Sequence, residues 1–145
     1  MDRRPGDLLE EGCVTVQFLA RWTRDVASSR IRAWHIVEAW NHADVACAKL
    51  KDSLPYFSGL RADVVVLQKP KMRILNLGVL GTLKSQVGLL VCDLCDPDWC
   101  LASDGYFRRF VELMSAFTVS NRGLQAGLEE DWGIKATVIE DRMPV

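Results

Sequence analysis

The chain has 145 residues, of which 49% are hydrophobic and 26% are charged, and this is the composition of one globular domain. Its 18 Lys and Arg against 19 Asp and Glu leave a net charge of −1, without the basic excess of a general nucleic-acid binder. No apolar run reaches the roughly 20 residues of a membrane helix, and no apolar core follows the first arginines as in a signal peptide. We therefore expect a single cytoplasmic domain over residues 1–145, with residues 1–12 as a flexible lead, no nucleic-acid partner and no membrane span.

Six short apolar runs along the chain predict β-strands, because each has four to seven residues and several are rich in β-branched side chains. They cover residues 13–19, 44–48, 63–67, 88–92, 116–119 and 136–139. The third and fourth runs are apolar on both faces, which is typical of the central strands of a parallel sheet with helices on each side.

Between these runs, apolar residues recur at helical spacing and predict four helices. The four stripes are Ala33, Ile36, Val37 and Trp40; Leu75, Val79 and Leu83; Phe107, Phe110, Val111 and Met114; and Leu124, Leu128 and Trp132. We expect the first and third stripes to face the core rather than a ligand. Ser28 or Ser29 suits the N-cap of the first helix, and Gly88 and Gly133 suit the C-caps of the second and fourth.

Strands that alternate with helices predict right-handed βαβ crossovers and an α/β fold. We expect a three-layer, doubly wound, mostly parallel six-stranded Rossmann-like sheet. Ligands of such sheets bind beyond the carboxyl ends of the strands, near the switch in strand order. The segments that leave each strand are therefore the places to look for functional residues.

The segment after the first run carries serines and arginines at the start of a helix. Ser28, Ser29, Arg30 and Arg32 would bring hydroxyls, backbone amides and guanidiniums to one helix N-terminus, which suits a phosphate or carboxylate. The segment has neither the glycine pattern of a dinucleotide site nor that of a P-loop. The alternative interpretation is a capped helix with exposed arginines.

Three carboxylates follow the fourth run, at Asp93, Asp96 and Asp98. They could chelate Mg²⁺, act as acid or base, or bind sugar hydroxyls. The paired-aspartate pattern of haloacid-dehalogenase-type enzymes is absent, because position 95 is Cys. The alternative is a polar turn in which Asp98 caps the segment that follows.

The five cysteines are an odd number in irregular contexts, which favours reduced thiols over a disulfide framework. Cys92, Cys95 and Cys100 supply three thiols, but Cys92 should lie along a buried strand and no fourth zinc ligand is adjacent. His35 and His42 have no neighbouring triad partner and are interpreted as structural or solvated. We therefore expect no metal site and no cofactor, and we assign no catalytic residue.

Four motifs occur in a fixed order along the chain. Residues 28–32 (SSRIR) open the first predicted helix, and residues 62–69 (ADVVVLQK) form a strand. Residues 90–99 (LVCDLCDPDW) form a strand and an acidic turn, and residues 116–124 (AFTVSNRGL) with 133–144 (GIKATVIEDRMP) form the last motif. In order and spacing they resemble the N-terminal, acceptor-side domain of GT-B glycosyltransferases, and the resemblance covers most of residues 13–144.

The resemblance implies a Rossmann-like half of a cleft that binds an acceptor. This half is not catalytically competent without a donor-binding C-terminal domain, which would follow Val145 or come from a partner chain. On this interpretation the acceptor- or ligand-binding residues are Ser28, Ser29, Arg30, Arg32, Gln68, Asp93, Asp96, Asp98, Ser120 and Arg142. The arginines would hold an anionic acceptor group, and the carboxylates would bind the hydroxyls of a sugar.

The alternative function is that of a non-enzymatic Rossmann-like module that binds a partner or forms a homodimer. It would use the face that a second domain would otherwise cover. Trp22, Trp99 and Met143 would then be interface anchors. Fold class alone does not choose between the two functions.

Overall fold

A computed structural model describes residues 14–40, 44–51, 57, 59–70, 72 and 75–141. The expected lead at residues 1–12, His42, the candidate site residue Arg142 and the candidate anchor Met143 lie outside the described residues.

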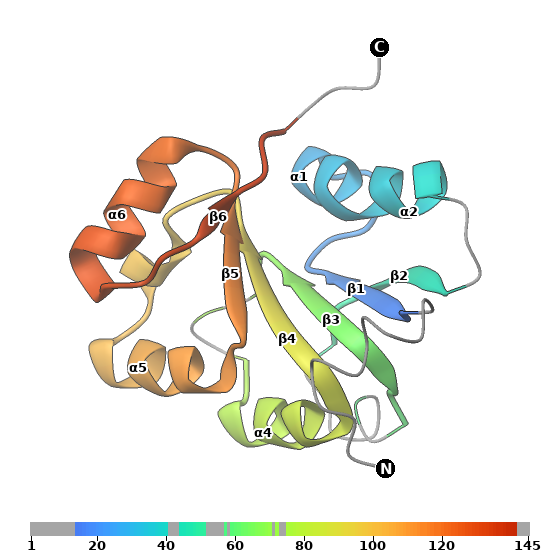
Figure 1. The fold of residues 1–145 in the computed structure, drawn as a ribbon, viewed down its shortest axis with the longest axis horizontal. Coiled ribbons are helices and arrows are strands. Elements are labelled where there is room, and N and C mark those ends of the chain that lie inside the picture. Colours follow the sequence, from blue (N-terminus) through green and yellow to red (C-terminus); the bar gives the residue numbers. More distant parts are fainter. Residues whose placement is uncertain are drawn as a thin grey trace.

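The described residues form a six-stranded sheet in which every neighbouring pair is parallel (Figure 1). The strands are β1 (Val16–Ala20), β2 (Val45–Lys49), β3 (Ala62–Gln68), β4 (Val87–Leu94), β5 (Ala116–Val119) and β6 (Thr137–Val138). Their order across the sheet is β2-β1-β3-β4-β5-β6. The predicted α/β, doubly wound Rossmann-like fold is thereby confirmed, and each of the six predicted runs overlaps a strand.

Two groups of helices lie on opposite faces of the sheet (Figure 1). After β1, the chain forms α1 (Ala27–Ser29), the π-helical turn η1 (Arg30–Trp34) and α2 (His35–Trp40), which lie over β1 and β2. The other face is covered by α4 (Leu77–Gln86), α5 (Asp104–Leu113) and α6 (Arg122–Trp132), and the 3-10 turn η2 (Asp98–Leu101) precedes α5. None of the helices in the described ranges combines the length and the apolar character that a membrane crossing requires.

The ends of the helices agree with the sequence prediction only in part. The first helix begins after Val26, which has no side-chain cap, so the predicted N-cap at Ser28 or Ser29 is wrong because the helix starts earlier. The predicted C-cap at Gly88 is also wrong, since α4 runs directly into β4, which contains this glycine. Gly133 ends α6 as predicted, with a φ of 67° that glycine adopts without steric cost.

The main core lies between the sheet and helices α4, α5 and α6. The strands contribute Leu19, Val65, Leu67, Leu90, Cys92, Leu94, Phe117 and Val119. Phe107 is fully buried, and its ring centroid lies 4.8 Å from that of Trp132 and 6.1 Å from that of Phe110. The third predicted stripe therefore faces the core, as expected.

The second face of the sheet has a much smaller core, beneath α1, η1 and α2. Its buried members are Phe18, Ala20, Ala33 and Val45. Trp40, predicted to face this core, is instead 57% exposed, because the π-helical turn lengthens the helical period and rotates the end of the stripe away. Farther across this face, Val66 and Val91 are only half-buried. The expectation that helices cover both sides of the central strands is therefore met on one side only.

Candidate functional site

The carboxyl ends of β1, β3 and β4 meet where the strand order switches, the usual ligand position in open parallel sheets. The register places Ala20, Gln68, Asp93 and Thr118 side by side in one row across four strands. In this row, polar side chains follow the apolar side chains of the preceding rows. Gln68 and Asp93 are both buried. The candidate site is built around this row.

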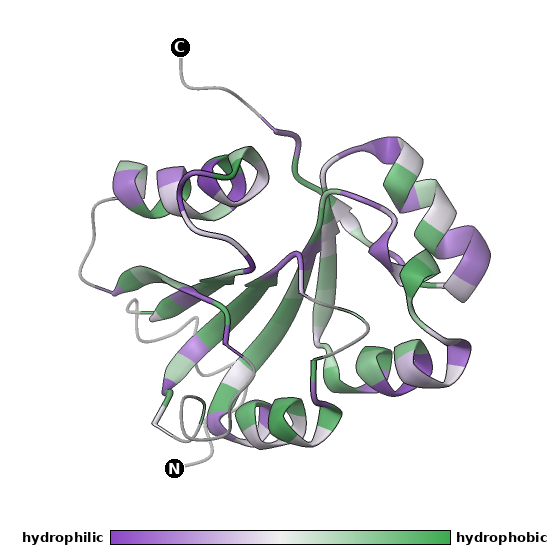
Figure 2. Ribbon diagram, turned by 180° about the vertical axis from the view of Figure 1, so that it is seen from behind, coloured by the Kyte–Doolittle hydropathy of each residue, from purple (hydrophilic) through white to green (hydrophobic). Residues whose placement is uncertain are grey.

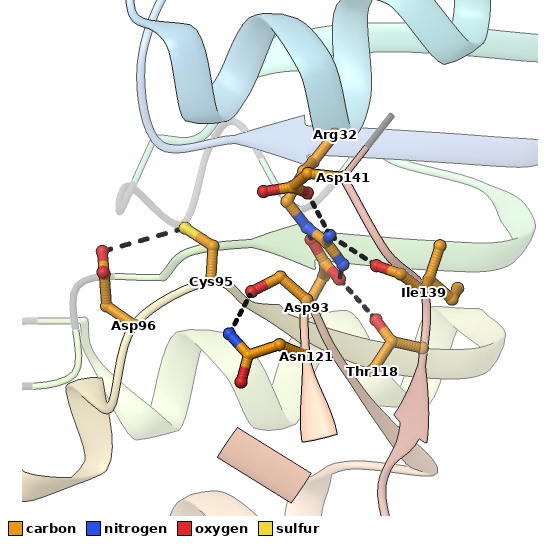
Figure 3. A network of polar contacts seen from close by, with 9 residues as sticks. Arg32, Asp93, Cys95, Asp96, Thr118, Asn121, Ile139 and Asp141 are labelled. Atoms are coloured by element: carbon orange, nitrogen blue, oxygen red, sulfur yellow. Dashed lines mark hydrogen bonds and ion pairs between the residues drawn. The ribbon is translucent and has the colours of Figure 1, made fainter. Parts of the chain in front are cut away.

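Arg32 and Asp93 form a buried ion pair in the row (Figure 3). Arg32 is 5% exposed and Asp93 is 4% exposed. Nε of Arg32 donates to Oδ2 of Asp93 at 2.7 Å, and Nη2 donates to Oδ1 of the same carboxylate. The hydroxyl of Thr118 donates to Oδ1 at 2.6 Å. This is the bidentate, charge-assisted geometry of a strong arginine–carboxylate pair.

The same guanidinium also holds the segment after β6 (Figure 3). Nη1 of Arg32 donates to the backbone oxygen of Ile139 at 2.7 Å and to Oδ1 of Asp141 at 2.5 Å. Burial alone would lower the pKa of Arg32, but the hydrogen bonds and charges of Asp93 and Asp141 raise it above its ordinary value. Arg32 and Asp93, which the sequence assigns to ligand binding, thus bind each other and tie η1, β4 and the C-terminal segment together.

Ser29 and Gln68 form a second buried pair in the same part of the site. The Ser29 hydroxyl donates to Oε1 of Gln68 at 2.8 Å and accepts the backbone N–H of Trp22 at 3.2 Å. Both residues are fully buried, and Nε2 of Gln68 has no hydrogen-bond partner among the described residues. A buried amide without a partner costs stability, so this group is an unusual feature of the row.

Lys69 follows β3 in a strained conformation. Its φ of 49° lies in the left-handed region, where non-glycine residues are rare and often functional. Its ammonium group pairs with the exposed carboxylate of Asp96. Burial alone would lower the pKa of Lys69, but the hydrogen bond that its ammonium donates to Asp96 and the neighbouring acidic groups raise it.

Asp98, the first residue of η2, is a buried carboxylate near Lys69 and Arg21. It is 6% exposed, and its Oδ2 has no hydrogen-bond partner in the described part of the chain. Burial raises the pKa of Asp98, while the charges of Lys69 and Arg21 act in the opposite direction. The predicted capping role is wrong, because Asp98 lies inside the turn and no side chain caps it.

We expect Asp98→Asn to raise the urea midpoint of unfolding at pH 7. The folded-state pKa of Asp98 lies above its unfolded value, so the stability that this carboxyl contributes is present below the unfolded pKa and is lost as the pH rises through the folded pKa. The gain from asparagine should therefore shrink below about pH 4, where the carboxyl is protonated in both states. A gain of equal size at both pH values would contradict this account.

The other predicted site residues lie around this cluster. Ser28 and Arg30 are half-buried on the first helix. Ser120 is half-buried after β5 and accepts a hydrogen bond from the Asn121 side chain at 3.4 Å. Asp96 lies apart from the Arg32 network in Figure 3. The structure therefore brings Ser29 and Arg32 of the first helix into contact with Gln68 and Asp93 of the row, and it leaves the remaining candidates outside this cluster.

Four members of the site are absent from the predicted set of ligand-binding residues. Lys69 and Arg21 each come directly after a strand, and that position was the available signal. Thr118 and Asp141 reach the ion pair through contacts between residues 25 and 109 positions apart, and no local pattern contains such contacts.

The cysteines of the acidic segment are buried to different degrees. Cys92 is fully buried on β4, as predicted, and burial raises its pKa well above the ordinary value. Burial also raises the pKa of Cys95 to about 11. Both thiols are therefore protonated at neutral pH and are poor nucleophiles. Within the described ranges, no three His, Cys, Asp or Glu side chains are grouped so that they could hold a metal ion.

Two of the candidate interface anchors can be placed. Trp99 is only 5% exposed, and its indole N–H donates to Oδ2 of Asp131 at 2.9 Å, so its expected role as an anchor is wrong. The cause is η2, which turns this side chain into the main core. Trp22 is 38% exposed, with the Arg21 guanidinium 5.0 Å from its ring centroid.

Comparison of the chain with protein-family models, with curated proteins and with solved structures finds no match.

Proposed function

We propose that this chain is the acceptor-binding domain of a glycosyltransferase-like protein, and that a sugar or similar polyhydroxylated acceptor binds at the carboxyl edge of β1, β3 and β4. The observation that carries the proposal is the pair of buried polar groups at this edge, Gln68 Nε2 and Asp98 Oδ2, that have no hydrogen-bond partner among the described residues. Transfer of the sugar requires a donor-binding domain from another polypeptide segment, because donor and acceptor must be held together.

The edge offers the mixture of hydrogen-bond donors and acceptors that a sugar requires. Asp96 and Asp98 supply carboxylate acceptors, and Gln68 and Lys69 supply N–H donors. Both atoms are buried in this structure, so a ligand hydroxyl reaches Gln68 Nε2 or Asp98 Oδ2 only when the covering side chains shift. Such a contact removes the cost of leaving that group unpaired. A hydroxylated ligand is favoured over an anionic one, because Arg32 is already neutralised by Asp93 and Asp141.

The proposal is tested by saturation-transfer NMR of the full chain against a panel of mono- and disaccharides. We expect at least one sugar to bind saturably, and Asp98→Asn to weaken that binding by about tenfold or more, since hydrogen bonds to charged groups contribute about 1.5–3 kcal/mol. Glu129→Gln alters an exposed carboxylate on α6 and is the matched control, which should bind like the unaltered chain.

The absence of saturable binding across the panel, or equal affinity of the unaltered chain and Asp98→Asn, would overturn the proposal. Because the same substitution is expected to stabilise the folded chain, a loss of sugar binding in this variant does not reflect unfolding. The urea midpoint of each variant, measured alongside, verifies this point.

A further inference from the structure

The second face of the sheet carries an apolar strip that α1, η1 and α2 leave half-exposed. Figure 2 shows the hydrophobic character of the central strands. Two rows of the register cross this strip. One row consists of Phe18, Val66 and Val91. The other lies closer to the amino ends of the strands and consists of Val16, Val64 and Leu89. On β3 and β4 these residues are half-buried, while their neighbours Val65 and Leu90, which face the main core, are buried. Parallel sheets are found almost only with both faces covered. The strip over β3 and β4 therefore has the character of a surface that another element covers.

A groove of about 740 Å³ lies over the carboxyl-side row of this strip, and the row of Val16, Val64 and Leu89 continues the apolar surface beyond it. Val66 and Val91 belong to its floor, Ile31 and Ile36 line it from the first helix, and Ile139 lines it from the segment after β6. The groove is thus bounded by described elements on two sides and has an apolar floor made by the sheet itself.

The dimensions of the strip suit one α-helix. Neighbouring strands lie about 4.8 Å apart, so β3, β4 and β5 together are about 14 Å wide, and a helix with its side chains is about 10 Å across. β4 has eight residues and is about 26 Å long, which equals the length of about 17 helical residues.

The carboxyl end of the groove is charged. The ionisable side chains that line it are Arg32, Arg122, Asp93, Glu140 and Asp141, two positive and three negative. Glu140 and Asp141 are exposed at this end; Asp141 also pairs with Arg32, and the lining as a whole keeps an excess of one negative charge. A helix that runs antiparallel to the strands, as the crossover helices of this fold do, places its partly positive N-terminus here.

We propose that an amphipathic helix of about 12–17 residues, supplied by a partner polypeptide, docks in this groove. Its apolar stripe packs on Val66 and Val91, and its first turn, carrying Lys or Arg, faces Glu140 and Asp141. A second copy of the chain is a poorer occupant, because the exposed large apolar side chains of the described residues form no helical stripe. They are Trp22, Val26, Trp40, Leu101 and Ile139.

The test is the selection of binders from a displayed library of random peptides of about 16 residues against the full chain. We expect the retained peptides to share apolar residues at i, i+3, i+4 and i+7 and a basic first turn. Val91→Glu should weaken their binding by about tenfold or more, because it buries a carboxylate beneath the stripe. Ala46→Glu, at an exposed position of β2, is the matched control and should bind like the unaltered chain.

Circular dichroism verifies that each variant folds, and Ile36→Glu repeats the test from the wall of the groove if Val91→Glu does not fold. Asp98→Asn should leave peptide binding unchanged, which separates this proposal from that of the sugar site. The proposal is overturned if no peptide is retained, if the retained peptides lack the helical pattern, or if they bind Val91→Glu as well as the control. Dimerisation of the chain that Val91→Glu abolishes would overturn it in favour of a second copy.

Discussion

Arg32→Ala is expected to lower the free energy of unfolding by about 3–5 kcal/mol, because it leaves the charge of Asp93 buried without its partner. Asp93 is 4% exposed and would keep the single hydrogen bond from Thr118. The substitution also removes the bonds that hold Ile139 and Asp141 against the first helix. Urea unfolding followed by circular dichroism measures the loss.

The matched control for this ion pair is Arg24→Ala. Arg24 pairs with Glu38 at 2.7 Å, but the two side chains are 61% and 43% exposed, so the cost should stay below about 1 kcal/mol. The double variant Arg32→Leu with Asp93→Leu should recover much of the stability that Arg32→Ala loses, because it removes both buried charges together. If Arg32→Ala costs no more than Arg24→Ala, the buried pair does not stabilise the fold.

Phe107→Ala is expected to cost about 3–5 kcal/mol of unfolding free energy, since it opens a cavity in the main core. The ring is fully buried and contacts the rings of Phe110, Phe117 and Trp132. Val66→Ala, on the half-exposed face, should cost no more than about 1 kcal/mol, because its side chain already contacts solvent. Chemical denaturation of the two variants measures this asymmetry between the faces.

The costs of Phe107→Ala and Val66→Ala also test the basis for the docking helix. Equal losses of unfolding free energy per carbon atom removed would mean that both faces are equally well packed in solution, and this would remove that basis. A small cost at Val66 that grows when a selected peptide is bound would indicate that the peptide buries this side chain.

The sheet and most of its strands were predictable from the sequence, because apolar runs of four to eight residues with β-branched side chains leave few alternatives to buried strands. Gly133 was predictable as a C-cap for a similarly local reason, its freedom to adopt a positive φ. The start of the first helix was mispredicted: the helix begins after Val26, and the Ser29 hydroxyl bonds Gln68 instead of capping it. That contact joins residues 39 positions apart and does not exist in the isolated segment.

The sequence by itself determined the fold class, the alternation of strands with helices, and the presence of polar residues at the carboxyl ends of the strands. Only the tertiary structure decided which polar residues are engaged with each other and which are not. Arg32 and Asp93 appear in the sequence as two candidate ligand-binding groups, 61 positions apart, and packing turns them into an internal ion pair. Within the described part of the chain, Gln68 and Asp98 keep buried atoms without a hydrogen-bond partner, and the sheet keeps a half-exposed apolar strip. The physical reason is that side-chain periodicity is a local property, whereas hydrogen-bond satisfaction and the covering of a sheet face depend on elements that meet only when the chain folds.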